Sequence, residues 1–315
     1  MIGVLSLPFP KEQNEQGEFK RQEDQFRLWV TRDGSSGYTA EPNRYHLYVS
    51  LACPWAHRTI IVRKLKQLDS IIGMTVVDPV RGEEGWAFRL GAGFSEDPIN
   101  GFKYLSEAYK LTNPSYNNRV TVPVLWDKKK RIIINNSEDD IMRIFNSEFN
   151  DLIPSTLDLY PEKYRQEINK WNDFIYPNIN DGVYRAGFAT SQNAYEKAVY
   201  KLFEALDVVE KNLSTHRYLT GKMLTEADWK LFPTLIRFDA VYYTHFKCNI
   251  RRIVDYKNIN GYLKELYQFD DIAQTVNFEH IKKHYFMTHP DINPNRIVPV
   301  GPQLDLTSPH GRDFI

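Results

Sequence analysis

The stretch YHLYVSLACPWAHRTIIVRKL, residues 45–65, predicts how the first half of the chain folds. Its opening residues, YHLYV at 45–49, are rich in aromatic and branched side chains and predict a short strand. A Cys-Pro step follows, and then an amphipathic pattern predicts a helix over 54–68. Pro54 suits the first helical position, because the N–H that proline lacks would be unpaired there anyway. We therefore expect a strand and a helix with Cys53 between them.

The segments that follow complete an α/β pattern. They predict in turn a strand, a long polar and Gly-rich insertion, the two strands of a hairpin and a helix, at residues 71–79, 80–118, 120–127, 131–136 and 138–147. Ser137 is the expected N-cap of the last helix, whose first turn is acidic. A parallel-type strand–helix–strand unit followed by a hairpin and a helix is typical of a thioredoxin-like domain.

The second half of the chain predicts an all-helical domain. Apolar residues recur there at three- and four-residue spacing in three sets: Ile168, Trp171, Ile175 and Ile179; Ala198, Leu202, Leu206, Val209 and Leu213; Ala227, Leu231, Leu235 and Phe238. Thr225 and Asp228 resemble a capping box ahead of the third set. The predicted organisation is an N-terminal arm, a thioredoxin-like domain, a helical domain and a C-terminal tail, at 1–40, 41–150, 151–289 and 290–315.

Composition narrows the functional classes. A chain of 315 residues suggests about two domains, and its forty basic and forty acidic residues cancel, so nothing indicates nucleic acid or a membrane surface as a partner. No stretch approaches the roughly 18 consecutive apolar residues of a membrane span, and the first residues do not resemble a signal peptide. Two distant cysteines cannot form a disulfide framework, so we expect a reducing, cytoplasmic setting.

Cys53 is the candidate nucleophile. A cysteine between a strand and a helix start lies near unpaired N–H groups and the positive end of the helix dipole, which both favour the thiolate. Arg58, one turn into the helix, is expected to add positive charge. A two-thiol reductase needs a second cysteine three residues after the first, where this chain has Ala56. Cys53 can therefore form a mixed disulfide that only an external thiol resolves.

Each of these features has a plain structural alternative. Cys53 is otherwise a small buried residue, the expected role of Cys248 in the helical domain. Pro123, in the segment TVPV, predicts either a cis bond at a strand start, with the Val122 backbone presented to a peptide-like thiol, or an ordinary trans proline at a strand edge. The pair His280 and His284 lacks the glutamate of a zinc protease motif, so we expect surface or packing roles and no metal site.

The chain resembles the Xi class of glutathione transferases, the glutathionyl-hydroquinone reductases, which are related to the omega class. The resemblance rests on SLACPWAHRT, RVTVPVLWD, GVYRAGFA, RFDAVYYTHFKCN, HIKKHYFMTHPDINP and PHGR, and it runs from about residue 20 to the tail. It implies a glutathione transferase fold, a thioredoxin-like domain followed by a helical domain. It also implies reduction of a glutathionyl-hydroquinone by glutathione, through a Cys53–glutathione mixed disulfide that a second glutathione resolves to oxidised glutathione.

The resemblance also implies roles for individual residues. Glutathione, a co-substrate, would be bound by Trp86, Arg119, Val120, Val122, Ser137 and Glu138. Tyr184, Tyr242 and Tyr285 would line the acceptor pocket and donate hydrogen bonds to the phenolic oxygen of the leaving hydroquinone. Members of the family usually read Glu-Ser at the start of the helix that here begins with Ser137 and Glu138, so this chain has the two residue types in the opposite order.

Two other functions stay open from sequence. One is omega-like thiol transfer, with dehydroascorbate or protein–glutathione mixed disulfides as acceptors. The other is a non-catalytic interaction module built on a transferase fold, which an intact Cys53 argues against. The expected partners are glutathione and an aromatic glutathione conjugate, with neither nucleic acid nor membrane, and the family resemblance implies a homodimer.

Overall fold

The structure, a computed structural model, describes residues 12–315, so the first eleven residues of the predicted arm lie outside the described part of the chain. Its contacts define two compact units. One, which we call the sheet unit, contains residues 23–159 and 270–284. The other, the helical unit, contains residues 12–22, 160–269 and 285–315. Each is described by itself.

The sheet unit is built on a four-stranded mixed sheet. Its strands β1 (Tyr45–Val49), β2 (Gly73–Val76), β3 (Val124–Asp127) and β4 (Ile132–Asn135) lie in the order β2-β1-β3-β4. β1 pairs in parallel with β2 and antiparallel with β3, and β3 pairs antiparallel with β4. Every residue of β1 is buried, as expected for a central strand covered on both faces. This arrangement confirms the predicted thioredoxin-like plan.

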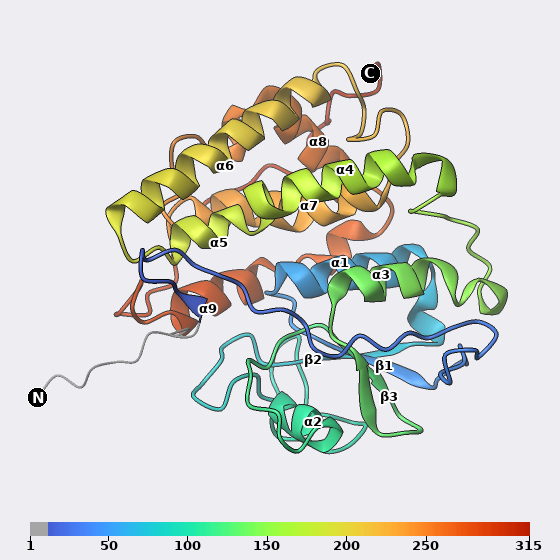
Figure 1. Cartoon of the computed structure of the whole chain (residues 1–315). Helices are drawn as coiled ribbons and strands as arrows, with labels where there is room; N and C mark the ends of the chain where they lie inside the picture. The colour runs from blue at the N-terminus through green and yellow to red at the C-terminus, as the bar shows by residue number, and fades with distance from the viewer. Residues whose placement is uncertain (1–11) are drawn as a thin grey trace, which may run out of the picture. The chain divides into compact units, whose positions relative to one another are not determined.

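Helices cover both faces of this sheet. Figure 1 shows α1 (Pro54–Leu65) and α3 (Glu138–Ser147) side by side over one face, with α2 (Leu105–Thr112) on the other side. Short 3₁₀ turns are η2 (Leu68–Ser70), η3 (Asn150–Leu152) and η8 (Ile272–Thr275). Helix α9 (Phe278–Thr288) contributes its residues up to His284 to this unit.

Several predicted bounds in the sheet unit are wrong. The first helix ends at Leu65 rather than 68, because the chain turns at Gln67, whose φ of 58° is left-handed. The predicted strands 71–79, 120–127 and 131–136 are each shorter in the structure. Within the insertion 80–118, α2 was not predicted, although its buried Leu105, Ala108 and Tyr109 have helical spacing. The helix over 138–147 is confirmed.

The helical unit contains η4 (Glu162–Tyr164), α4 (Arg165–Ile175), η5 (Tyr176–Asn180), α5 (Gly182–Gly187), α6 (Gln192–Leu213), α7 (Glu226–Arg237), η6 (Phe238–Tyr242), η7 (Ile253–Asp255) and α8 (Lys257–Gln268). α6 packs against α5 and α8, and α7 packs against α4. The predicted capping box is confirmed, since the Thr225 N–H donates to the Asp228 carboxylate at 2.8 Å. The tail from residue 290 carries no helix or strand, as predicted.

Two π turns, η5 and η6, interrupt predicted helices. Ile179 belongs to η5 rather than to a continuation of α4, and Phe238 begins η6 rather than ending α7. Pro177 supplies a reason for the first break, because it has no N–H to donate within the helix. The chain instead closes a wider turn, in which the Asp181 N–H donates to the Tyr176 carbonyl at 2.8 Å. Such turns are frequent at functional sites, and two predicted acceptor tyrosines lie close to them.

Among residues 12–315, none of the helices combines the length and the apolar character needed to cross a membrane. Both cysteines in this part of the chain are free thiols.

Candidate functional site

Cys53 occupies the N-cap position of α1. Its backbone is extended, Pro54 follows as the first helical residue, and no acidic side chain lies in the first turn of the helix. The thiol is partly exposed and donates to the Val122 carbonyl, with Sγ and O 3.6 Å apart. A thiolate at this position faces the positive end of a helix with no carboxylate in that first turn to oppose it. The predicted position and its proline are thus as expected.

The segment that faces Cys53 is held by buried hydroxyl groups. The Val122–Pro123 bond is cis, which confirms the first of the two alternatives for Pro123. The last β1–β3 ladder pair joins Tyr48 to Val124, so Val122 lies outside the ladder. The Tyr109 hydroxyl donates to the Thr121 carbonyl at 2.9 Å. The backbone beside Cys53 is therefore fixed in place while remaining outside the sheet, where a peptide-like ligand can pair with it.

Arg119 and Val120 begin this same segment. Both are half-buried, and the Tyr116 hydroxyl donates to the Arg119 carbonyl at 2.6 Å. The Tyr116 ring lies against that of Tyr109, with centroids 4.8 Å apart. Two tyrosines from the end of α2 and the loop after it thus support the strand approach that carries Arg119, Val120 and Val122.

Trp86 lies in the insertion and is buried. Its ring stacks on His284, with centroids 5.0 Å apart and planes 18° from parallel. The Arg81 guanidinium lies 5.2 Å from the Trp86 ring centroid. His284 also bonds through Nδ1 to the Pro79 carbonyl at 2.7 Å, so it ties α9 to the insertion. His284 takes the packing role, one of the two expected for it, but its stacking partner could not be read from sequence, since the two positions differ by 198.

Ser137 and Glu138 stand at the start of α3. Ser137 holds the N-cap position, but its side chain makes no capping bond, so that part of the prediction is wrong. Its N–H instead donates to the Asn135 side chain at 2.8 Å. The Glu138 carboxylate accepts from the Arg58 guanidinium at 3.0 Å, and that guanidinium lies 4.5 Å from the Trp55 ring centroid. The charge of Arg58 is therefore paired with that of Glu138.

The helical unit brings the three predicted acceptor tyrosines together. The Tyr285 hydroxyl is central, 2.5 Å from the Tyr184 hydroxyl and 3.0 Å from the Tyr242 hydroxyl. Tyr184 comes from α5, Tyr242 ends η6 and Tyr285 belongs to α9, so three distant parts of the chain supply one hydroxyl cluster. All three residues are buried, and Phe246 packs against each of their rings. We call these residues the tyrosine cluster.

The protonation of this cluster follows from its burial. Burial raises the pKa of Tyr242 and of Tyr285 well above the usual tyrosine value, and the positive charge of Arg237 opposes this only in part. Both hydroxyls therefore keep their protons near neutral pH and can donate them in hydrogen bonds. A group of neutral donors held together in an apolar surround is suited to an oxygen on which negative charge develops.

Other candidate residues pack rather than react. Cys248 is fully buried, its thiol lies 3.9 Å from the Val183 carbonyl, and burial raises its pKa, which confirms the predicted packing role. His280 bonds to the Ala92 carbonyl at 2.7 Å, also as expected. Among residues 12–315, no group of three or more His, Cys, Asp or Glu side chains is arranged to hold a metal ion.

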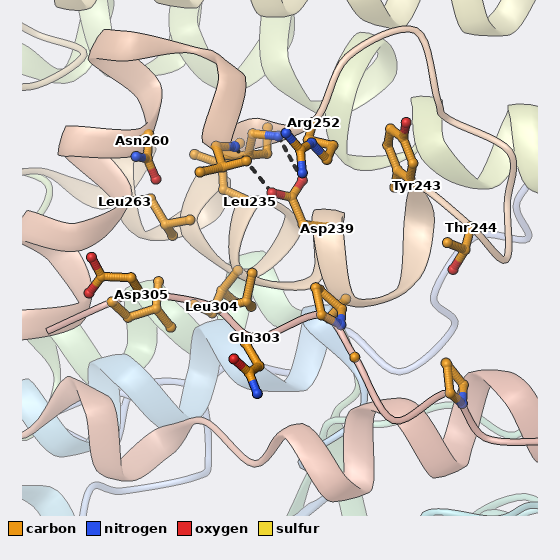
Figure 2. Close-up of a pocket in the computed structure, with 18 residues that line it drawn as sticks. Leu235, Asp239, Tyr243, Thr244, Arg252, Asn260, Leu263, Gln303, Leu304 and Asp305 are labelled. Carbon is orange, nitrogen blue, oxygen red and sulfur yellow. Dashed lines mark hydrogen bonds between the residues drawn. The ribbon is translucent and has the colours of Figure 1, made fainter.

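A cavity of about 460 Å³ lies elsewhere in the helical unit (Figure 2). Leu235 and Asp239, Leu263 of α8 and Leu304 of the tail are among its lining residues. The Asp239 carboxylate accepts a hydrogen bond from the N–H of Ile253 at 2.6 Å, so it stabilises the backbone of a neighbouring turn. None of the predicted site residues is among the described residues that line this cavity, and we do not assign it to the reaction.

Comparison with known proteins gives an independent view of the chain. Residues 52–148 match the model of the glutathione S-transferase N-terminal domain, and residues 192–265 match that of the C-terminal domain. The glutathionyl-hydroquinone reductase YqjG of Escherichia coli is 50% identical over 304 residues, which are 94% of this chain and 93% of that protein. Its glutathione-bound structure superimposes with a TM-score of 0.90 and covers 92% of this chain and 96% of that one.

Two further proteins show the same similarity over most of the chain. The glutathionyl-hydroquinone reductase PcpF of Sphingobium chlorophenolicum is 48% identical over 290 residues, 92% of this chain and 91% of that protein. The structure of glutathione-S-transferase Xi from Phanerochaete chrysosporium is 49% identical in sequence and has a TM-score of 0.89, covering 92% of this chain and 99% of that one. The similarity extends over both units and confirms the fold expected from sequence.

Proposed function

Because the chain belongs to the glutathione transferase family, within its Xi class of glutathionyl-hydroquinone reductases, we propose that it reduces glutathionyl-hydroquinones with glutathione through a mixed disulfide at Cys53. The observation that carries the proposal is the position of Cys53 at the N-terminus of α1, partly exposed and with Ala56 in place of a second cysteine. The start of a helix stabilises the thiolate form of Cys53, and because Ala56 replaces a second cysteine, an external thiol must resolve the mixed disulfide.

In the first step the Cys53 thiolate attacks the sulfur that joins glutathione to the ring. An S–S bond forms between Cys53 and glutathione, and the C–S bond of the conjugate breaks. The electron pair of that bond passes to the ring carbon, which takes up one proton from water, and the ring leaves as the hydroquinone. The second glutathione returns one proton to water when its thiol ionises for the next step. The ring has been reduced by two electrons, and the two sulfur atoms have been oxidised to a disulfide.

We assign the tyrosine cluster to the phenolic oxygen of the leaving hydroquinone. Negative charge develops on that oxygen as the C–S bond breaks, and neutral hydroxyl donors stabilise it. The structure supports this role in two ways: the hydroxyls of Tyr184 and Tyr242 converge on that of Tyr285, and burial keeps the hydroxyls of Tyr242 and Tyr285 protonated. A buried, largely aromatic surround also suits a flat ring.

In the second step another glutathione thiolate attacks the glutathione sulfur of the mixed disulfide. Cys53 leaves as a thiolate, and oxidised glutathione is released. Atoms and electrons balance over the cycle: one conjugate and one glutathione give one hydroquinone and one oxidised glutathione. Reformation of the Cys53 thiolate is favoured by the same helix start that favoured it before the reaction.

We assign the tripeptide of glutathione to residues of the sheet unit. Val122 lies outside the ladder with its backbone fixed, and so suits pairing with the cysteine of glutathione. Arg119 and Val120 precede it, and an arginine offers paired donors to a carboxylate. Ser137 and Glu138 stand at a helix start, which suits a carboxylate, while the acidic side chain suits an ammonium group. Trp86 completes the proposed set.

The test is intact mass spectrometry after incubation with oxidised glutathione. The wild-type chain should gain the mass of one glutathione, lose it again on addition of free thiol, and reduce a glutathionyl-hydroquinone. Cys53→Ser should do none of these, whereas the control Cys248→Ser should behave as wild type. Unchanged turnover by Cys53→Ser would show that the mechanism is wrong and would favour another nucleophile. Turnover of dehydroascorbate in preference to the conjugate would favour omega-like thiol transfer.

We also propose a homodimer and a cytoplasmic setting, both as predictions. The first rests on the family and the second on the two free cysteines. Light scattering coupled to size-exclusion chromatography measures the first, and fractionation of the source cells measures the second.

A further inference from the structure

Residues 13–19 of the N-terminal arm contact the part of the helical unit that carries Tyr184. The Gln13 side chain donates to the Phe188 carbonyl at 2.9 Å, and the Phe19 ring packs against that of Phe188 at 5.4 Å between centroids. Gly17 has a φ of 79°, and a Cβ there would lie 2.7 Å from the Thr190 hydroxyl. This close approach and left-handed backbone both require glycine. Residues 12–22 of the arm therefore pack as part of this unit.

Arg21 follows directly and reaches the tyrosine cluster. Its guanidinium carbon lies 4.7 Å from the centroid of the Tyr184 ring, and its Nε donates to the Asp181 carboxylate at 2.8 Å. The side chains of Arg21 and Asp181 are 19% and 4% exposed, so this pair is largely shielded from water. Asp181 caps α5, and its carbonyl accepts the Tyr184 N–H at 3.0 Å. One arginine thus contacts both the ring of Tyr184 and the residue that begins its helix.

We propose that Arg21 is a positioning residue for the reaction, which holds the ring of Tyr184 in the tyrosine cluster and strengthens its hydroxyl as a hydrogen-bond donor. The inference rests on the proposed function, because it concerns the acceptor side of that reaction. A cation over the face of an aromatic ring is attracted to the ring and stabilises the ring further when negative charge moves onto it. The hydroxyl of Tyr184 therefore donates more strongly to an oxygen that is becoming negative.

The guanidinium of Arg21 stays protonated. Burial lowers its pKa, but the negative charge of Asp181 and the neighbouring Tyr176 and Tyr184 outweigh burial, so the pKa of Arg21 is raised above its usual value. Asp181 accepts from a second cation, Arg185, at 3.0 Å, so this carboxylate is shared between two guanidinium groups. The positive charge at the Tyr184 ring is accordingly not cancelled by its own ion-pair partner.

The other groups that face Tyr184 do not duplicate this effect. Its hydroxyl meets that of Tyr285, and its ring meets those of Tyr242, Phe188 and Phe246. The positive charge of Arg237 acts on Tyr242 and Tyr285. Arg21 places its cation on the Tyr184 ring, and it comes from the arm rather than from the helices.

Arg185 provides a matched control. Like Arg21 it bonds to the Asp181 carboxylate, but it is more exposed to solvent, with 44% of its side chain accessible. Arg185→Met removes a cation from the same carboxylate and leaves the ring contact in place. Arg21→Met removes both, and Arg21→Lys keeps a charge but loses the planar group that stacks on the ring.

The experiment compares two substrates. With a glutathionyl-hydroquinone, Arg21→Met should lower kcat about tenfold, Arg21→Lys less, and Arg185→Met less than twofold, as expected for loss of a shielded cation–π contact. With the mixed disulfide of glutathione and 2-mercaptoethanol, which has no phenolic oxygen, all three should match wild type. Equal losses on both substrates would indicate a structural role alone and overturn the inference, as would an unchanged kcat of Arg21→Met with the conjugate.

A second measurement does not depend on activity. With 3-fluorotyrosine at position 184, ¹⁹F NMR across a pH titration reports the acidity of that hydroxyl. Arg21→Met should weaken this acid by about tenfold, which is one pKa unit, and Arg185→Met should leave it unchanged. An unchanged titration in Arg21→Met refutes the inference. Failure of the wild-type chain to reduce the conjugate refutes the proposed function instead, so the two failures can be told apart.

Discussion

Tyr285→Phe removes one oxygen atom from the centre of the tyrosine cluster, and its effect can be estimated from the contacts of that atom. The Tyr285 hydroxyl lies 2.5 Å from that of Tyr184 and 3.0 Å from that of Tyr242, and the residue is 1% exposed. Its loss removes one hydrogen bond from each of two buried hydroxyls, and each lost hydrogen bond costs about 0.5–1.5 kcal/mol of folding free energy. If the cluster also donates to the phenolic oxygen, one missing donor lowers kcat by about 10²–10³-fold.

Single-turnover kinetics separate these two effects. Transfer of glutathione from the conjugate to Cys53 should slow by the full factor, whereas release of the mixed disulfide by a second glutathione should be unchanged, because no hydroquinone takes part in it. Tyr262→Phe is the control, since Tyr262 is also buried in the helical unit and its hydroxyl donates to Asp228 at 2.7 Å. It should lose stability but not the first step. Equal slowing of both steps, or of both variants, would refute the reasoning.

Three further predictions concern stability and pH. Arg58→Met should lower the free energy of unfolding by about 3–5 kcal/mol, because Arg58 is 1% exposed and its loss removes the ion-pair partner of Glu138. In urea unfolding, the double variant Arg58→Met/Glu138→Gln should recover much of this loss, and an absence of recovery would contradict the pairing. Burial lowers the pKa of His46 and of His245 to about 4, so between that value and about 6.5 the unfolded chain binds protons that the folded chain does not. The free energy of unfolding should therefore fall as the pH drops through this range, by on the order of 1 kcal/mol per pH unit for each histidine. His46→Gln should show a shallower fall, and an equally steep fall would contradict the role of His46. Gly187→Ala should destabilise the chain, since its Cβ would lie 2.1 Å from the Phe246 side chain. Gly182→Ala, on the same helix, meets nothing closer than 3.7 Å and should be tolerated. Thermal unfolding measures the difference, and equal melting temperatures would contradict the clash.

Local patterns in the sequence carried much of the fold. Pro54, the apolar spacing of α6 and the Thr225–Asp228 pair each depend on neighbours within a few residues, and these features are confirmed. α2 was missed because its short apolar pattern lies in a polar, Gly-rich segment, although Leu105 and Ala108 carried the signal. The π turns could not be predicted from periodicity alone, because an extra residue in one turn shifts every later position.

The site divides in a similar way. The place of Cys53 and the meaning of Ala56 follow from local sequence and general thiol chemistry. The tyrosine cluster does not, because Tyr184, Tyr242 and Tyr285 are separated by 58 and 43 positions and meet only through packing. No periodicity distinguishes these three from the other sixteen tyrosines of the chain. Only the resemblance to a family singled them out, and Arg21, which lies outside its quoted motifs, was not found at all.

The ion pair of Arg58 with Glu138 bears on how the thiol of Cys53 becomes reactive. From sequence, its charge one turn into α1 is a natural source of thiolate stabilisation. In the structure, its guanidinium bonds to Glu138 and lies over Trp55, so it joins the start of α3 to α1. The order Ser137-Glu138 gives this contact to the first residue of α3. We therefore expect the backbone N–H groups at the start of α1 to be the main stabilisation of a Cys53 thiolate, because Arg58 is paired with Glu138 and no acidic side chain lies in that first turn. On this account, Asp introduced at Trp55 or Ala56 should impair Cys53 more than neutralising Arg58 does.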